Sequence, residues 1–149
     1  MIKSRKWIRR YLDLAEHISG WSKDPSTKVG AVVIGEDGEV LAQGYNGFPR
    51  GVKDSVVRLE DRELKYQLVV HAELNCIYHA ARIGLSLKNS TMFISGLPPC
   101  NECAKGLIQA GINTVFVLAD KTKVEWLPAY HISQQMFQEA GVKCTVYNL

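Results

Sequence analysis

Three residues of this 149-residue chain have types and spacings that suit a metal site: His71, Cys100 and Cys103. The two cysteines are three positions apart, so on a helix their sulfur atoms would lie on one face, one turn apart. A helix N-terminus carries positive potential and free N–H groups, which favour the thiolate form that binds metals. With the imidazole of His71 they provide three ligands and leave a fourth tetrahedral position for water, an arrangement that suits zinc.

Glu73 follows His71 by two positions and is not required as a ligand. A carboxylate beside a water molecule on zinc can take a proton from it, because the pKa of such a water falls to about 7. The same carboxyl group can then deliver that proton to the substrate. On a heteroaromatic ring with an exocyclic amine, we expect protonation of a ring nitrogen, attack at the carbon that bears the amine and release of ammonia, with one side chain acting as base and then as acid.

Neither half of this pattern is specific when taken alone. A Cys-x-x-Cys pair also occurs in redox motifs and structural zinc sites, and His-x-Glu is a common chance match. Together, with Pro99 directly before Cys100, they match the His-x-Glu and Pro-Cys-x-x-Cys signature of zinc-dependent deaminases. We therefore expect a zinc ion on His71, Cys100 and Cys103, with Glu73 as the catalytic residue.

The other cysteines and histidines have no partner motif. Cys76 would lie on the far side of the helix that follows His71, and Cys144 falls in a predicted strand, so we expect both in the core. His17, His79 and His131 fall in predicted helices and are interpreted as packing or surface residues. No secretory signal is visible, so we expect reduced thiols and a cytoplasmic location.

Composition indicates one globular domain spanning 1–149, with 46% apolar and 22% charged residues and a net charge of +3. No stretch approaches the roughly 20 apolar residues of a membrane span. Basic residues do cluster near the start of the chain, which could indicate nucleic-acid binding. We favour a solvated helix face over a nucleic-acid partner. The cluster consists of Lys3, Arg5, Lys6, Arg9 and Arg10.

Hydrophobic periodicity predicts a β-hairpin followed by alternating helices and strands. Glycines 20, 84, 111 and 141 stand where predicted helices should end. The order indicates a three-layer α/β/α sandwich with a five-stranded mixed sheet. The predicted helices are 7–18, 71–83, 101–110 and 129–140, with a short one at 59–68; the strands are 28–34, 40–45, 91–95, 114–118 and 142–147.

Several further blocks accompany the metal motif and together cover most of the chain from about residue 20 to 142. They are Ser22-Lys23-Asp24-Pro25, Lys28-Val29-Gly30-Ala31, Gly44-Tyr45-Asn46-Gly47-Phe48-Pro49-Arg50-Gly51, His71-Ala72-Glu73-Leu74-Asn75, Pro99-Cys100-Asn101-Glu102-Cys103-Ala104-Lys105, Ile108-Gln109-Ala110-Gly111-Ile112, Ala119-Asp120-Lys121 and Ala140-Gly141-Val142. In these blocks the sequence resembles the deoxycytidylate (dCMP) deaminases of the cytidine deaminase superfamily. The Gly-Tyr-Asn-Gly-x-Pro-x-Gly block is more particular to that family than the zinc motif.

The resemblance implies a cytidine deaminase-like fold and conversion of dCMP to dUMP, which feeds thymidylate synthesis. It implies that Asn46 holds the sugar and that the backbone N–H of Ala72 meets the pyrimidine carbonyl. Some relatives carry extra cysteine and histidine residues for a second zinc, and the stretch 46–70 has none. We therefore expect one zinc ion per chain.

The resemblance also implies a homo-oligomer, often a hexamer, that dCTP activates and dTTP inhibits. The implied effector site uses Gly44, Tyr45, Asn46, Gly47 and Arg50.

Basic residues in the matching blocks are candidates for contacts with the 5′-phosphate of the nucleotide. Lys28 and Arg50 flank the asparagine block, and Lys121 follows the strand predicted at 114–118. Ligands of open α/β sheets gather beyond the carboxyl ends of strands, where Lys121 is expected. We therefore expect substrate contacts from Lys28 and Lys121.

Other functions share parts of the pattern. A free cytidine or cytosine deaminase would use the same metal chemistry. A tRNA adenosine deaminase would suit the basic start of the chain, but its usual Cys-Ala-Gly-Ala continuation is replaced here by Cys103-Ala104-Lys105-Gly106. A catalytically idle sensor of dCTP or dTTP would have no need for Glu73.

Overall fold

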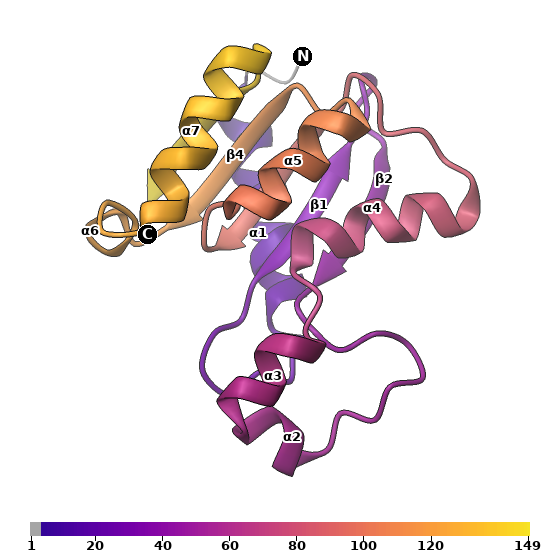
Figure 1. Ribbon diagram of the computed structural model, residues 1–149. Helices are drawn as coiled ribbons and strands as arrows, with labels where there is room; N and C mark the ends of the chain where they lie inside the picture. Colours follow the sequence, from indigo (N-terminus) through magenta and orange to yellow (C-terminus); the bar gives the residue numbers. More distant parts are fainter. Residues whose placement is uncertain (1–3) are drawn as a thin grey trace.

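The computed structural model describes residues 4–149 and contains a five-stranded mixed sheet (Figure 1). The spatial order of the strands is β2-β1-β3-β4-β5. Strand β1 pairs antiparallel with β2 and with β3, whereas β3, β4 and β5 run parallel. This arrangement confirms the predicted hairpin and mixed sheet. The strands are β1 (Gly30–Ile34), β2 (Val40–Tyr45), β3 (Thr91–Gly96), β4 (Thr114–Ala119) and β5 (Lys143–Asn148).

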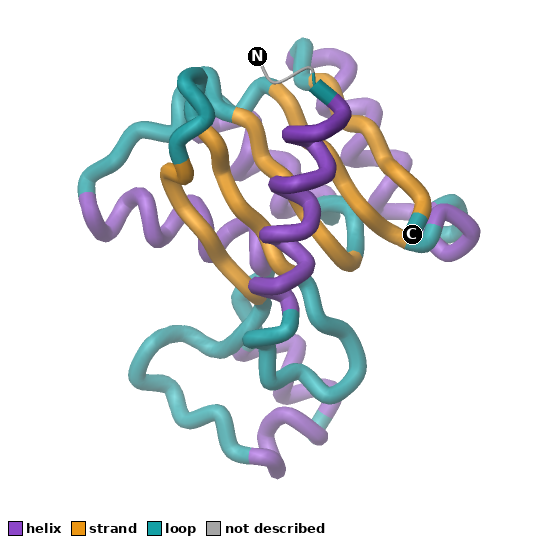
Figure 2. Tube along the Cα trace, turned by 180° about the vertical axis from the view of Figure 1, so that it is seen from behind, coloured by secondary structure: helices purple, strands orange, loops and turns teal. Residues whose placement is uncertain are grey.

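Helices cover both faces of the sheet, which confirms the predicted three layers. Helix α1 (Arg5–Ser19) lies across one face (Figure 2). Helices α4 (Ala72–Ile83), α5 (Asn101–Ala110) and α7 (Pro128–Ala140) cover the other (Figure 1). Because side chains alternate along a strand, neighbouring strand residues enter different cores.

Each face of the sheet has its own hydrophobic cluster. On the α1 side the cluster contains Ile8, Leu12, Ala15, Ile18, Val32, Ile34, Phe93, Phe116 and Leu118. On the opposite side, Ala31, Val33, Met92, Ile94, Val115 and Val117 of the strands pack against buried residues of α4, α5 and α7. The two clusters are therefore separated by the sheet itself.

The predicted helix ends agree with the structure, since glycines stop the three helices that cover the second face. Gly84, Gly111 and Gly141 have φ values of +74°, +88° and +77°, in the left-handed region that residues with a side chain adopt only at a cost. In each case the glycine N–H bonds to carbonyl groups of the last helical turn. These glycines thus fix where the chain leaves each helix.

The segment 46–70, which leaves the sheet after β2 and returns at α4 and is called the excursion below, contains two helices where a single short one was predicted at 59–68. It contains α2 (Val56–Glu60) and α3 (Arg62–Leu68), separated by Asp61. Asp61 is extended, with ψ of 97°, and its carboxylate accepts the Leu64 N–H at 3.2 Å, so it caps α3 and interrupts the helical run. The base of the excursion is closed by two backbone hydrogen bonds between Gly47 and Val70.

A short helix, α6 (Lys121–Val124), was not predicted from the sequence. The carboxylate of Asp120 caps it by accepting the Thr122 N–H at 3.0 Å. Four residues give too little periodicity for a helix to be recognised in the sequence, which is why the cap residue is its only signal.

Close contact between β2 and α4 depends on Gly44. A Cβ atom at this position would lie 2.5 Å from the Ala72 carbonyl oxygen and 2.9 Å from the Cys76 amide nitrogen, both backbone atoms. Gly106 allows α5 to approach α4 in the same way, since a Cβ there would be 2.9 Å from a methyl group of Leu74. These close approaches fix the position of α4 against β2 and of α5 against α4.

The basic side chains at the start of the chain lie on the exposed face of α1, with Lys3 outside the described residues. Arg9 pairs with Asp13 at 2.9 Å, and the guanidinium group of Arg10 stands 4.7 Å from the ring centre of Trp7. Within residues 4–149, none of the helices combines the length and apolar character that crossing a membrane requires.

Candidate active site

The three expected metal ligands meet where the N-termini of α4 and α5 converge. His71 is the N-cap residue of α4, and Cys100 is the N-cap residue of α5. Neither side chain makes the hydrogen bond to its own helix that N-cap residues usually make. Both are instead turned toward each other, and Cys103 joins them from the first turn of α5.

The geometry of these three side chains fits a zinc ion. Nδ1 of His71 is 3.3 Å from Sγ of Cys103 and 3.5 Å from Sγ of Cys100, and all three ligand atoms lie within 4.8 Å of one another. In a tetrahedral zinc site, bond lengths of ~2.0 Å to nitrogen and ~2.3 Å to sulfur place the two ligand atoms about 3.5 Å apart. The chain therefore presents one imidazole and two sulfur ligands at the right separation.

The pKa values of the two thiols are shifted in opposite directions. The hydrogen bond from Cys103, together with the one to His71, lowers the pKa of Cys100 to about 3, which favours the thiolate form that binds metals. Donating that hydrogen bond, together with burial, raises the pKa of Cys103. The hydrogen bond to Cys100 also raises the pKa of His71. A dication in this position would displace the shared proton and bind both sulfurs as thiolates.

Glu73 lies in the first turn of α4 with only 4% of its surface exposed. Burial raises the pKa of its carboxyl group, because a charged carboxylate loses its hydration there. A carboxyl group whose pKa has moved toward neutrality can both accept and donate a proton during a reaction. Glu73 borders the same cavity as His71 and Cys100, where a proton-transfer group for a metal-bound water would have to lie.

A cavity of about 180 Å³ opens in front of these residues. It is lined by parts of the segment 24–29, by Asn46, by α3, by the first turn of α4 and by the segment 97–100 that leads into α5. His71, Ala72, Glu73 and Cys100 all border it. Ala72 is the first residue of α4, where backbone N–H groups have no partner within the helix. That N–H is thus suited to bind a carbonyl group of a ligand.

Asn46 borders the same cavity and joins two segments of backbone. Its Oδ1 accepts the Val29 N–H at 2.9 Å, and its Nδ2 donates to the Thr27 carbonyl at 2.9 Å. A side-chain amide has a second N–H and a second lone pair beyond these two bonds. Asn46 can therefore hold the loop and still offer one donor and one acceptor to a ligand hydroxyl.

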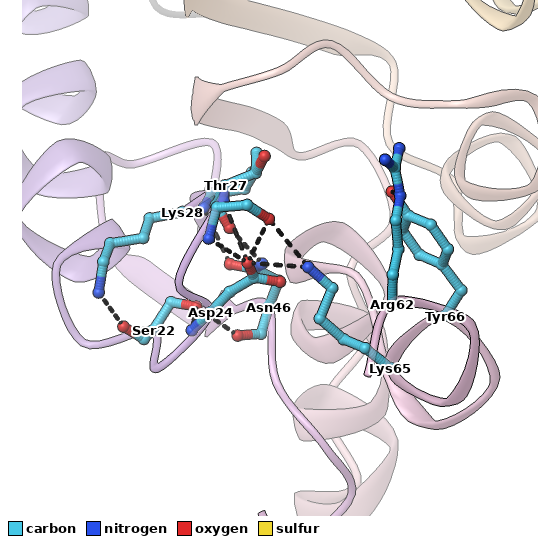
Figure 3. A network of polar contacts seen from close by, with 10 residues as sticks. Ser22, Asp24, Thr27, Lys28, Asn46, Arg62, Lys65 and Tyr66 are labelled. Carbon is cyan, nitrogen blue, oxygen red and sulfur yellow. Dashed lines mark hydrogen bonds and ion pairs between the residues drawn. The ribbon is translucent and has the colours of Figure 1, made fainter. Parts of the chain in front are cut away.

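Two of the expected substrate contacts do not border this cavity. Figure 3 shows the side chain of Lys28 directed away from Lys65, and its ammonium group donates to the Ser22 carbonyl. Lys121 begins α6, where its backbone N–H bonds to Asn148 Oδ1 at 3.1 Å. Neither lysine is among the residues that line the cavity.

The residues expected to bind an effector lie mostly at a second cavity, of about 340 Å³. Gly44, Tyr45, Gly47 and Arg50 line it together with Trp21, Phe48 and residues of α4. Asn46 does not; it lines the first cavity and a smaller one beside it. The second cavity thus contains a guanidinium group and several aromatic rings.

Sequence reasoning did not single out Asp24 and Lys65 as site residues. Lys65, from α3, places its ammonium group 3.2 Å from Asp24 Oδ1, and both residues border the first cavity. Asp24 belongs to a block that matches the family, so its position carried a signal. Lys65 carried none, because a lysine in a short polar helix is ordinarily exposed.

The two remaining cysteines, both predicted in the core, differ in burial. Cys76 is buried against β1, where its thiol lies 3.4 Å from the Ala31 carbonyl oxygen, and Cys144 is partly buried. His17, His79 and His131 are not part of the ligand group that the described residues form.

Known proteins resemble this chain over nearly its whole length. A deaminase encoded in the luxG 3′ region of Aliivibrio fischeri is 38% identical over 143 residues, which are 94% of this chain and 92% of that protein. Human deoxycytidylate deaminase is 36% identical over 148 residues, 92% of this chain and 77% of the human protein.

Among solved structures, the dCMP deaminase of cyanophage S-TIM5, in complex with dCMP and dUMP, superposes with a TM-score of 0.82. It is 28% identical, and the match covers 98% of this chain and 100% of that one. The family model described as the cytidine and deoxycytidylate deaminase zinc-binding region matches residues 5–119, which include all three ligands and Glu73. This chain belongs to the cytidine and deoxycytidylate deaminase family.

Proposed function

We propose that this protein is a zinc-dependent dCMP deaminase that hydrolyses the 4-amino group of dCMP to give dUMP and ammonia. The observation that carries the proposal is the meeting of His71, Cys100 and Cys103 beside the buried carboxyl group of Glu73, in a cavity that Asn46 also borders. Similarity to the human and cyanophage deaminases supports the choice of nucleotide.

In the proposed reaction, His71, Cys100 and Cys103 hold the metal, which when bound lowers the pKa of a coordinated water to about 7. Glu73 takes the proton of the attacking water and transfers it to N3 of the ring as C4 becomes tetrahedral. Glu73 then takes the proton of the new hydroxyl group at C4 and donates it to the amine, so that the C4 carbonyl forms, the C4–N bond breaks and ammonia leaves. Because the carboxyl group is buried, its proton passes to the substrate rather than to bulk water.

The remaining groups at the cavity orient the nucleotide. The N–H of Ala72 donates to the carbonyl group at C2 of the pyrimidine, and the amide of Asn46 binds the sugar hydroxyl. Both assignments rest on groups that the geometry leaves available, namely a first-turn helix N–H and the unused half of an amide. Together they would place C4 toward Glu73 and the metal.

We propose further that the chain acts as one deaminase domain, since both hydrophobic clusters pack against the same sheet. All four cysteines are free thiols, and two of them serve as ligands, which supports a reducing compartment such as the cytoplasm.

We also propose that dCTP and dTTP regulate the protein and that it forms a homo-oligomer, a hexamer by the resemblance given above. Regulation is supported by the second cavity, where the ring of Tyr45 could contact a base and Arg50 could bind phosphate.

Zinc content tests the ligand assignment. The purified protein should contain about one zinc ion per chain by metal analysis. The double variant Cys100→Ala with Cys103→Ala should lose it, because two of the three ligands are gone. Cys144→Ala serves as the control and should keep its zinc. Full zinc in the double variant would show that the metal is held elsewhere.

Glu73→Gln tests the proton transfer. Glutamine fills the same volume but cannot exchange a proton, so kcat should fall by roughly 10²–10⁴-fold while zinc and fold are kept. Glu102→Gln, on the exposed first turn of α5, is the matched control and should retain its rate. Near-normal turnover by Glu73→Gln would remove this residue from the mechanism.

The choice of nucleotide over nucleoside is tested by steady-state kinetics on dCMP and deoxycytidine. If a charged contact holds the 5′-phosphate, kcat/KM for dCMP should exceed that for deoxycytidine by roughly 10²-fold or more. Equal efficiencies would favour a free nucleoside deaminase. Turnover of tRNA alone would favour the adenosine deaminase alternative, and no turnover of any substrate would favour a nucleotide sensor.

Effector control is tested by adding dCTP or dTTP to the dCMP assay. dCTP should raise the rate at low dCMP and dTTP should lower it. Arg50→Ala should weaken both responses, because the guanidinium group is the cationic side chain among the described residues that line the second cavity. Kinetics that respond to neither nucleotide would contradict this part of the proposal.

A further inference from the structure

The ammonium group of Lys65 is held inside the protein at the border of the active-site cavity. Lys65 is only 6% exposed, whereas lysine is rarely buried unless it is paired. Its Nζ lies 3.2 Å from Asp24 Oδ1 and 2.9 Å from Ser26 Oγ (Figure 3). An ammonium group has three N–H donors, so one remains for a further acceptor.

The loop that contains Asp24 is held by its own hydrogen bonds. Asp24 Oδ1 accepts the backbone N–H groups of Ser26 and Thr27 at 2.9 and 3.0 Å, as well as the Ser26 hydroxyl at 3.0 Å. Burial acts to raise the pKa of Asp24, but these donors and Lys65 together hold it below its usual value. Asp24 is therefore a carboxylate whose own loop holds it in place, and it positions the ammonium group of Lys65.

Lys65 stands between the metal end of the cavity and the outside. Ser26, Thr27, Lys65 and Tyr66 line the cavity that contains Glu73, and the same four residues line an adjoining cavity of about 390 Å³. Arg62 lies in this outer cavity, and its Nε donates to the Tyr66 hydroxyl at 3.2 Å. The acidic residue that also borders it is Glu60, which is exposed.

We propose that Lys65 is the specificity-determining residue that binds the 5′-phosphate, with the hydroxyl group of Thr27 beside it. The inference rests on the proposed function, because it assumes that the base lies at Glu73 and the phosphate points outward. A nucleotide oriented in this way presents its 5′ end to the wall shared by the two cavities. Charge-assisted bonds from a pre-positioned ammonium group then distinguish a nucleotide from a nucleoside.

The test is the ratio of kcat/KM for dCMP to kcat/KM for deoxycytidine. Lys65→Met keeps the apolar stem of the side chain and removes the charge, so this ratio should fall about 10- to 100-fold, as expected for loss of a charged hydrogen bond. Lys53→Met makes the same change on the exposed part of the excursion and should leave the ratio as in the wild type.

Removing Lys65 alone leaves Asp24 as a buried unpaired carboxylate, which can impair folding. The double variant Asp24→Asn with Lys65→Met removes both charges, and it should fold and show the same fall in the ratio. Lys28→Met tests the competing location for the phosphate.

The outcomes separate the two proposals. An unchanged ratio in the Lys65 variants, even if both efficiencies drop equally, would reduce Lys65 to a structural role and overturn the inference while dCMP deamination stands. A fall caused by Lys28→Met instead would move the phosphate to that residue. A wild-type enzyme without preference for dCMP would overturn both proposals.

Discussion

His71 and Cys100 stand at the two positions where α4 and α5 would ordinarily carry a capping residue, and the arrangement of the site follows from this. Losing a side-chain cap typically costs about 1 kcal/mol per helix. In return for this loss of helix stability, the side chains of His71 and Cys100 both point from the helix ends toward the metal position. That position exists only because the helices lie side by side on the same face of the sheet, and Gly44 and Gly106 permit the approach. At the two N-cap positions, residues that can bind a metal replace the residues that would best cap the helices.

The same region concentrates buried charge, in two different forms. Glu73 has its pKa raised by burial, which suits a group that must gain and lose a proton. Asp24 is also buried, yet its pKa is lowered by the donors around it, so it remains a fixed negative charge beside Lys65. Two carboxyl groups on one cavity are thereby held for opposite purposes, one for proton exchange and one for positioning. The difference arises from hydrogen-bond donors, since both side chains are shielded from water.

Elements with a local signal could be predicted from the sequence. Glycine stops defined the helix ends, runs of β-branched and apolar residues defined the strands, and the ligand spacing defined the metal site. Asp61 and α6 were missed because a single capping aspartate gives a weak signal within a polar stretch. Lys65 was missed for a different reason: its contact with Asp24 joins residues 41 positions apart, and pairing across such a distance leaves no periodic pattern. Lys28 was favoured for the opposite reason. It belongs to a block that matches the family, and Val29 of that block lines the first cavity, but the side chain of Lys28 bonds to the Ser22 carbonyl instead.

The cluster beneath α1 contains none of the residues assigned to metal, substrate or effector. The sheet separates this cluster from the site, and α1, which covers the cluster, lies on the face of the sheet opposite α4 and α5 (Figure 2). Substitutions at Ile8, Leu12, Ile18 and Phe116 are therefore limited by side-chain packing, and they can occur without changing the residues of the active site. Core substitutions in this layer can therefore change the thermal stability of the protein without changing its turnover rate.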